Sequence, residues 1–386
     1  MMIERAQEEM TNESAAWLDL RPKRNIVVIT GAGASANLGR YGKALPLMPA
    51  WASSLVDRLG DHYASILGLT PNMPGPEFEA TLGRFLEFQR ALPKIKEYGL
   101  LGSVPPPGGE IIDFMTWYER AVQLSKGLNA AIWQNLFDLF ALDQIDTHRA
   151  HRTYMKLHQD LRSPDDNGPE SYISHVTTNF DTAIEAAIQI EAETDKKIEL
   201  LTGFAQQPGL GDDLWAPNLL NDGRLNGTCR YPVLHLHGAV GWYYSDDGIR
   251  RRPSTDRFDD SLKLEPALLL PDDQKNPETF SVPLRQVWEE FKVLLAGCTH
   301  IVVIGHSLGD AHIVKAIRDS DKPTAVIAYV PSQTDGRFKV SDEIRTALKR
   351  RLPQAEVFGG DFGRDKKAHS DLDVELLQAW LRYTTR

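Results

Sequence analysis

The sequence predicts an α/β protein, in which a Rossmann-like doubly wound parallel sheet carries an inserted helical module. Two observations lead to this fold class. Short runs of β-branched residues, typical of strands buried on both faces, alternate with stretches of helical periodicity, an order typical of parallel sheets. The long interval from 31 to 170 shows helical periodicity and no strand pattern, which indicates an insertion after the first strand.

The first part of the chain alternates only once before the insertion. A polar stretch over 1–20 is expected to be a tail or short helix, and NIVVIT at 25–30 predicts the first strand. The predicted helices that follow are 51–59, 77–98 with a kink or stop at Pro93, 111–142 and 148–161. We therefore assign 58–162 to the helical module, and 21–57 together with 163–386 to the Rossmann-like domain.

The α/β alternation resumes after the module. The predicted strands are 172–177, 198–202, 233–236, 301–304, 325–330 and a short one near 357. The predicted helices are 181–190, 284–295, 341–351 and one from 372. Residues 205–230 are rich in Gly, Pro, Asn and Asp, so they predict a long loop of the kind that forms lids or binding elements.

Composition excludes several classes of protein. The 386 residues are 42% hydrophobic and 25% charged, which is typical of globular proteins, and the net charge of −10 disfavours direct binding to nucleic acid or a membrane surface. Two cysteines, Cys229 and Cys298, cannot form a four-thiolate zinc site, and we expect no metal. No apolar run is long enough to span a bilayer and MMIERAQEEM lacks an apolar signal core, so we expect a cytoplasmic location.

Four loops follow predicted strands, and in an open α/β sheet ligands bind at that edge. Gly31-Ala32-Gly33-Ala34-Ser35 could bring backbone N–H groups to a pyrophosphate, or could be a tight turn without a ligand. An acid at the end of a second strand, expected in nicotinamide dehydrogenases, is missing.

In the second loop, the strand ends at Thr177 and Thr178-Asn179-Phe180-Asp181 follows. It could place an amide and a carboxylate in one cleft, although for these residues alone capping of the next helix is the favoured interpretation.

The third loop follows a strand in which His235 and His237 share one face. His237 lies at the strand end beside Gly238, whereas His235 is expected to be a core residue, because a lone HxH pair is a weak metal signal. His148, His151 and His158 lie on a predicted helix and are interpreted as surface or structural residues.

The fourth loop, Gly305-His306-Ser307-Leu308-Gly309, allows two interpretations. It matches the G-x-S-x-G nucleophile elbow of serine hydrolases in the expected strand–turn–helix context. The 79 residues after Ser307 would then have to supply His369 with Asp335 or Asp361, a cramped arrangement. Alternatively, Gly305 and Ser307 hold the phosphate or ribose of a nucleotide.

Taken together, the four loops resemble the motifs of the sirtuin superfamily. GAGAS at 31–35, TTNFD at 177–181, LHG at 236–238 and GHSL at 305–308 occur in the family's order. Two features of the deacylases are missing, namely the four zinc cysteines and the P-D-F-R stretch. PAWASSL at 49–55 and the G-x-S-L-x-D pattern ending at Asp310 resemble instead the sirtuin-like NAD-hydrolysing proteins of bacterial anti-phage defence. A free-standing chain of this length resembles the subunit that pairs with a hexameric HerA-type ATPase.

The resemblance implies an NAD glycohydrolase that uses NAD as substrate and contains no zinc. It implies that Asn179 positions the ribose or the attacking water and that His237 is the general base. It implies NAD contacts for residues of three loops, namely Gly31, Ala32, Gly33, Ser35, Thr178, Asp181, Gly305 and Ser307. Asp181 would hold the nicotinamide amide and Ser307 a phosphate or the adenine-side ribose. A serine esterase using Ser307 and a non-catalytic NAD or ADP-ribose binding module remain as alternatives.

Assembly and control follow from the same resemblance. Trp117, Trp133, Phe137 and Phe140 lie on or near one helical stripe, which could be internal core or an interface. The resemblance favours an interface, because similar defence proteins form large homo-oligomers that dock on a ring-shaped ATPase. We therefore expect a homo-oligomer larger than a dimer, partner control and no direct nucleic acid binding.

Overall fold

The computed structural model describes most of the chain. The described residues are 25–99, 114–161, 172–205, 212–220, 229–252, 265–269, 282–329, 339–360 and the helical residues Leu377, Trp380 and Leu381. The predicted tail over 1–20 lies outside them. None of the helices within the described ranges is long and apolar enough to cross a membrane. Those ranges also contain no group of three or more His, Cys, Asp or Glu side chains that could hold a metal ion.

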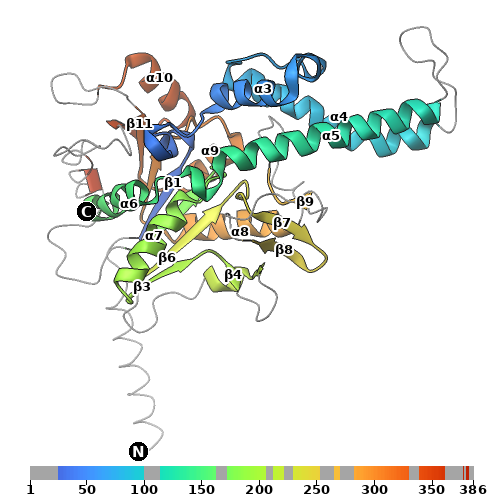
Figure 1. Ribbon diagram of the computed structural model, residues 1–386. Coiled ribbons are helices and arrows are strands. Elements are labelled where there is room, and N and C mark those ends of the chain that lie inside the picture. The colour runs from blue at the N-terminus through green and yellow to red at the C-terminus, as the bar shows by residue number, and fades with distance from the viewer. Residues whose placement is uncertain are drawn as a thin grey trace, which may run out of the picture.

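A seven-stranded sheet in which every pairing is parallel forms the centre of the molecule, which confirms the predicted fold class (Figure 1). Its strands are β1 (Asn25–Thr30), β2 (Tyr172–Thr177), β3 (Ile198–Leu201), β6 (Cys229–His235), β10 (His300–Ile304), β11 (Thr324–Tyr329) and β12 (Glu356–Gly360). Their order is β12-β11-β10-β1-β2-β6-β3. The chain thus runs to one side of β1 first and returns to its other side through β10.

Helices cover both faces of this sheet, because alternate residues of each strand point to opposite sides. Ile26 and Val28 of β1 pack with α6 (Thr147–Leu161) and α7 (Ala183–Thr194). Val27 and Ile29 pack with α8 (Val282–Gly297), α9 (Ala311–Ser320) and α10 (Asp342–Arg351). The short helical elements are α2 (Ala32–Ser35), η1 (Arg40–Gly42), η2 (Leu142–Gln144) and η3 (Pro217–Leu220).

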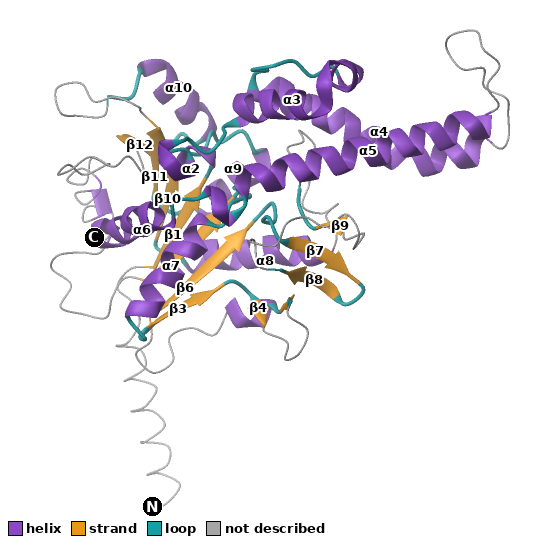
Figure 2. Ribbon diagram, in the orientation of Figure 1, coloured by secondary structure: helices purple, strands orange, loops and turns teal. Residues whose placement is uncertain are grey.

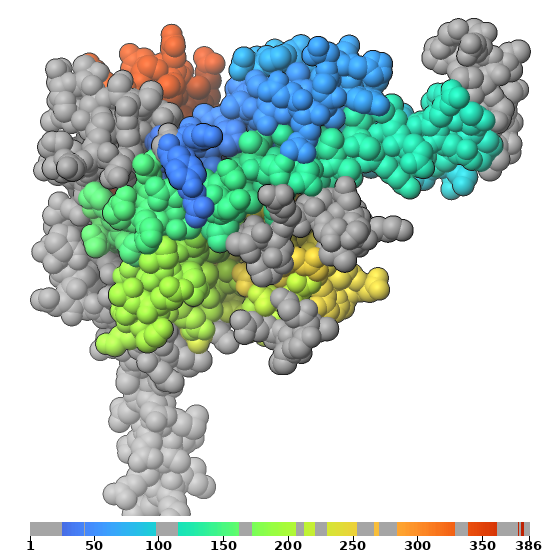
Figure 3. Space-filling view, in the orientation of Figure 1, coloured from blue at the N-terminus to red at the C-terminus, as the bar shows by residue number. Residues whose placement is uncertain are grey.

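Three long helices form a separate unit with its own core. They are α3 (Met48–Leu67), α4 (Gly75–Gly99), which continues through Pro93, and α5 (Phe114–Phe140). The α4–α5 pair extends away from the sheet as an antiparallel arm (Figures 1 and 3). At its inner end Trp51 contacts the rings of Phe78 and Phe140, and also that of Phe180 in the loop after β2. The helical unit therefore packs against the predicted site.

The aromatic stripe of α5 is mostly internal. Trp133, Phe137 and Phe140 belong to the core of the helical unit, whereas Trp117 is half-buried. For the first three residues the interface interpretation is therefore wrong and the internal alternative holds. They are buried because α5 presents this face to α3.

A second, antiparallel sheet was not predicted (Figure 2). Its strands are β4 (Phe204–Ala205), β5 (Asp213–Trp215), β7 (Trp242–Ser245), β8 (Gly248–Arg251) and β9 (Glu265–Pro266). One of them, β5, lies within 205–230 together with η3, and β4 ends at Ala205, so the prediction of one continuous loop there is wrong for the described part. Strands this short carry too little alternation to be recognised. Phe204 makes T-shaped ring contacts with Trp215 and Trp242, and these three side chains join the second sheet to the core of the central sheet.

Candidate active site

Strand register brings the four predicted loops to one edge of the sheet. Thr30, the last residue of β1, pairs with Ile304 of β10 on one side and with Thr177 of β2 on the other. Thr177 in turn pairs with His235 of β6. The four loops therefore leave their strands at nearly one level. The strands that follow β1 are added on one side of it and those from β10 onward on the other, and such a switch point is where open α/β sheets bind ligands.

The two glycine loops pack backbone against backbone. The N–H of Gly31 donates to the Ile304 carbonyl at 3.0 Å, and that of Gly33 donates to the Gly305 carbonyl at 2.9 Å. Gly305 has φ +59°, and a Cβ atom there would lie 2.3 Å from the nitrogen of Ala34. These contacts alone explain the glycines, so binding of a pyrophosphate stays a proposal. Ala32, at the tip of this loop, is exposed.

Asn179 is buried and its amide group is fixed. Nδ2 donates to the Gly31 carbonyl at 3.1 Å and to Oγ of Ser35 at 2.8 Å, which ties the loop after β2 to the loop after β1. Thr178 joins the same contact through its N–H, which donates to the Thr30 carbonyl. Both donors of the amide are thus engaged, and the carbonyl oxygen Oδ1 is the atom left to meet a ligand or water.

Asp181 lies at the end of this loop, two residues before α7. Its Oδ1 accepts a hydrogen bond from the N–H of Ala183, the first residue of α7, although the N-cap position itself is Thr182, whose side chain makes no capping hydrogen bond. Burial raises the pKa of Asp181, and hydrogen bonds from Ala183 and Ser35 only partly oppose that effect. The side chain is 4% exposed, so a role in holding the nicotinamide amide, the role that the resemblance implies, stays a proposal.

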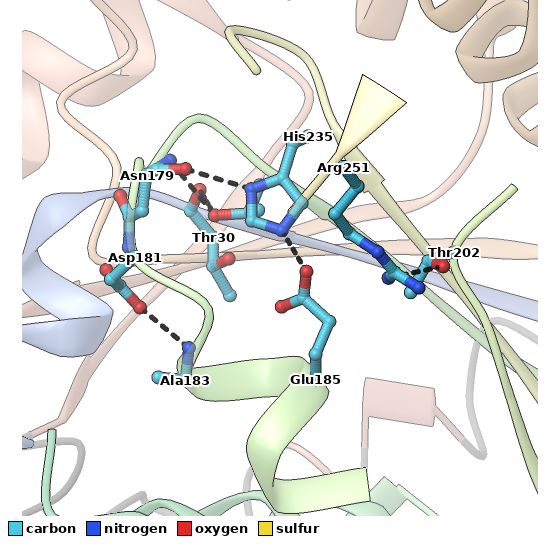
Figure 4. Close-up of polar contacts among 9 residues, drawn as sticks. Thr30, Asn179, Asp181, Ala183, Glu185, Thr202, His235 and Arg251 are labelled. Carbon is cyan, nitrogen blue, oxygen red and sulfur yellow. Dashed lines mark hydrogen bonds and ion pairs between the residues drawn. The ribbon is translucent and has the colours of Figure 1, made fainter. Parts of the chain in front are cut away.

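His235 is a buried residue with a partner on each nitrogen, as expected of a core histidine. Nδ1 lies 3.1 Å from the Asn179 carbonyl and Nε2 lies 2.6 Å from Oε1 of Glu185 (Figure 4). Burial, the largest influence, lowers the pKa of His235, but the charge and hydrogen bond of Glu185 and the Asn179 carbonyl raise it above its ordinary value. Burial raises the pKa of Glu185, but His235 outweighs it and the net pKa is lowered. The pair is therefore ionic and anchors the Asn179 loop.

His237 follows at the end of the same strand. Gly238 has φ +75°, and a Cβ there would lie 2.1 Å from the Ala267 carbonyl, so this turn requires glycine. The N–H of Leu269 donates to the His237 carbonyl at 2.8 Å, which holds the turn from outside. Nε2 of His237 lies 3.4 Å from Oδ2 of Asp310, and both side chains are 6% exposed.

The loop at 305–310 does not have the geometry of a serine nucleophile. Ser307 is exposed, its Oγ accepts a hydrogen bond from the N–H of Gly309 at 3.2 Å, and its carbonyl accepts one from Arg351. The non-glycine residue with positive φ in this loop is Leu308, at +56°, whereas a nucleophile elbow strains the serine itself. His369, Asp335 and Asp361 lie outside the described residues.

The histidines of α6 and β2 lie apart from this edge. His151 contacts Glu191 at 2.6 Å near the surface. His158 is buried, its Nε2 lies 2.7 Å from Nε2 of His175, and its ring stacks on Tyr231. Burial lowers the pKa of His175 to about 3, so this histidine is uncharged near neutral pH, whereas the pKa of His235 is raised.

Two contacts of this edge were not predicted from the sequence. Glu185 lies on the helix after Asp181, one turn further along, and nothing in the pattern shows that it faces His235. In the sequence, Asp310 is marked only as the last residue of the G-x-S-L-x-D pattern. It is the N-cap of α9, a helix that was not among the predicted ones, and its second oxygen lies near His237 only through the tertiary fold.

Comparison with known proteins gives no match in sequence and weak matches in structure. No family model matches the sequence, and no curated protein matches it. A Sir2 homologue mutant in complex with 2'-O-acetyl ADP-ribose aligns over 93% of this chain and 91% of its own, with 14% identity and a TM-score of 0.37. A Sir2 homologue in complex with NAD aligns over 93% and 89%, with 14% identity and a TM-score of 0.35. Similarity at these values assigns neither a family nor an activity.

Proposed function

We propose that the chain is an NAD glycohydrolase, which converts NAD and water to nicotinamide and ADP-ribose. The observation that carries this proposal is the placement of Asn179 and His237. Both are buried, and they follow the register pair Thr177 and His235 by the same two residues on neighbouring parallel strands. In this proposal the acceptor amide oxygen and the imidazole act together at the ends of β2 and β6, on the edge of the sheet that also carries the switch point between β1 and β10. The four-loop resemblance supports NAD as the substrate.

The reaction breaks the bond between the nicotinamide nitrogen and the ribose carbon. The electron pair of that bond leaves with nicotinamide, and the ribose carbon passes through an oxocarbenium-like state that water captures. His237 takes the proton that the attacking water or a ribose hydroxyl releases, because imidazole titrates near neutral pH. Oδ1 of Asn179 accepts a hydrogen bond from that water or hydroxyl and orients it.

The remaining loop residues bind the substrate in this proposal. Ala32 at the exposed tip, with Gly31, Gly33 and Ser35, lies along the pyrophosphate. Thr178 and Asp181 lie around the nicotinamide end of NAD, and Asp181 holds the carboxamide. Gly305 and Ser307 contact a phosphate or the adenine-side ribose, and the exposure of Ser307 is compatible with that contact.

We further propose that this activity serves bacterial anti-phage defence under the control of a partner. A constantly active NAD hydrolase would deplete its own cell, so the enzyme requires a trigger. The resemblance favours a homo-oligomer larger than a dimer that docks on a hexameric HerA-type ATPase. Contact with DNA would then belong to the ATPase, in agreement with the −10 charge of this chain.

Nicotinamide and ADP-ribose release from NAD tests the function. The purified chain, alone and with a HerA-type ATPase, is incubated with NAD, and products are separated by chromatography. We expect stoichiometric nicotinamide and ADP-ribose, and a loss of at least ~1,000-fold in Asn179→Ala with unchanged folding. NAD binding without any product under both conditions would instead establish the non-catalytic binding module.

Product release that is retained in Asn179→Ala and lost in Ser307→Ala would contradict the assignment of the site. A fluorophosphonate probe provides the control, because it labels an activated serine and should leave Ser307 unmodified in this chain.

A further inference from the structure

We propose that Asp310 is a positioning residue for His237, so that the two side chains form a histidine–carboxylate dyad. This inference rests on the proposed function, because it takes His237 as the base. It starts from the 3.4 Å separation between Nε2 of His237 and Oδ2 of Asp310, both of them on side chains with 6% exposure. Because both groups are buried, little water competes with the carboxylate for the imidazole nitrogen.

The two oxygens of Asp310 have separate tasks. Oδ1 accepts hydrogen bonds from the N–H groups of His312 and Ile313, at 3.0 Å and 3.2 Å, and thereby caps α9. An N-cap needs only one oxygen, and asparagine or serine caps as well as aspartate does. Oδ2 is not used by the helix and faces His237 instead.

The cap also fixes where the carboxylate lies. Asp310 is anchored to α9, whose residues Ile313, Val314 and Ile317 are buried against the sheet. His237 is anchored at the end of β6 by the hydrogen bond from Leu269 to its carbonyl and by the turn at Gly238. Each partner thus belongs to a rigid element, and the contact joins the strand end of β6 to the helix that follows β10.

A carboxylate at Nε2 selects one form of the neutral imidazole. Carboxylate oxygens only accept hydrogen bonds, so the proton of the ring resides on Nε2 and the lone pair on Nδ1. When His237 takes a proton, the imidazolium that forms lies beside a negative charge. The 3.4 Å distance is longer than a strong hydrogen bond, and a small rotation of either side chain would bring the two atoms within hydrogen-bond distance.

The matched variants are Asp310→Asn and Asp310→Ser. Both retain an oxygen for the N-cap, so the melting temperature should stay within about 3 °C of the wild type. Asp310→Asn replaces Oδ2 by an NH₂ group, which donates rather than accepts and would reverse the preference of the ring. Ser341→Ala, which removes the cap of α10 away from the site, is the control for loss of a cap alone.

Two measurements on the full chain test the dyad. In NAD turnover we expect kcat to fall by at least ~100-fold in Asp310→Asn and Asp310→Ser, with KM changed less than about threefold and Ser341→Ala unaffected. In ¹⁵N-histidine spectra, assigned with His237→Gln, we expect the His237 ring to carry its proton on Nε2 in the wild type and on Nδ1 in Asp310→Asn.

The spectrum needs no turnover, so it decides the role of Asp310 even if the chain does not hydrolyse NAD and the proposed function fails. An unchanged kcat in an active enzyme, or His237 ring signals that are identical in wild type and Asp310→Asn, would overturn the proposal.

Discussion

Two histidines of one strand end meet carboxylates in contrasting ways. His235 and Glu185 lie 2.6 Å apart with 1% and 13% of their side chains exposed, and the other nitrogen of His235 faces the Asn179 carbonyl. His237, in the loop after β6, and Asp310, in the loop after β10, lie 3.4 Å apart. Both pairs are buried, so the difference lies in distance: the first pair forms a short hydrogen bond, whereas the second pair is too long for a strong one. The two histidines, only two residues apart, thus differ in how tightly each is held by its carboxylate.

The largest effect on stability is expected from breaking the pair of His235 and Glu185. Glu185→Ala leaves His235 buried without its counter-charge, so the free energy of unfolding should fall by about 3 kcal/mol. Glu191→Ala is the matched control, because its bond to His151 is also 2.6 Å but both side chains are about one quarter to one third exposed. That variant should lose less than about 1 kcal/mol in denaturant titrations. Equal losses would remove the distinction between buried and surface pairs.

A histidine held neutral should respond to acid in the opposite way to His235. The pKa of His175 is lowered by burial to about 3, against 6.5 for the ordinary residue, so the unfolded chain binds the proton and the native chain does not. Between pH 7.5 and pH 5 the wild type should therefore lose about 2 kcal/mol of stability relative to His175→Gln. A gap between the two proteins that stays constant over this range would show that His175 titrates normally.

The ionic pair should contribute most in a defined pH window. Because the pKa of His235 is raised in the folded state, its protonation stabilises the fold below pH 6.5. This contribution to stability is lost as the pH rises through the folded pKa. Because the pKa of Glu185 is lowered in the folded state, its ionisation stabilises the fold above pH 4.5. This contribution to stability is lost as the pH falls through the folded pKa. The gap in stability between wild type and the double variant His235→Gln/Glu185→Gln should thus be greatest between pH 4.5 and 6.5. It should decline by about 1.4 kcal/mol per pH unit just above that window. A gap that grows above pH 7 would contradict an ionic pair.

The smallest effect is expected at the exposed loop. Ser307→Ala removes one hydroxyl whose described partner is a backbone N–H, so NAD turnover should change by less than about tenfold, mainly through KM. Steady-state kinetics over a range of NAD concentrations will measure this. A loss of kcat as large as that expected for Asn179→Ala would place Ser307 with the reacting atoms instead of the binding loop.

Buried parallel strands could be predicted closely, and the reason is physical. Strands 25–30 and 172–177 have the predicted bounds, because β-branched runs buried on both faces have few alternatives. The carboxyl-end loops followed from that prediction, since parallel strands bring their ends to one edge. The antiparallel sheet did not follow, because strands such as Phe204–Ala205 are specified by aromatic contacts between distant residues.

Within the site, residue positions were easier to predict than partners. That Asn179 and His237 lie at strand ends follows from local pattern. That Ser35 accepts from Asn179, or that Asp310 faces His237, depends on how α2 and α9 rotate about their axes and on which loops touch. The glycines show the same limit, since Gly31 and Gly33 proved to be required by the Gly305 loop and not necessarily by a ligand.

The rate of nicotinamide release in wild type and His237→Gln, with unfolding free energies measured on the same samples, tests the central claim most directly. Glutamine keeps a polar side chain of similar reach but cannot take the proton. The account predicts NAD hydrolysis by the wild type and a loss of at least ~1,000-fold in the variant at nearly unchanged stability. NAD hydrolysis at equal rates in both proteins would contradict it.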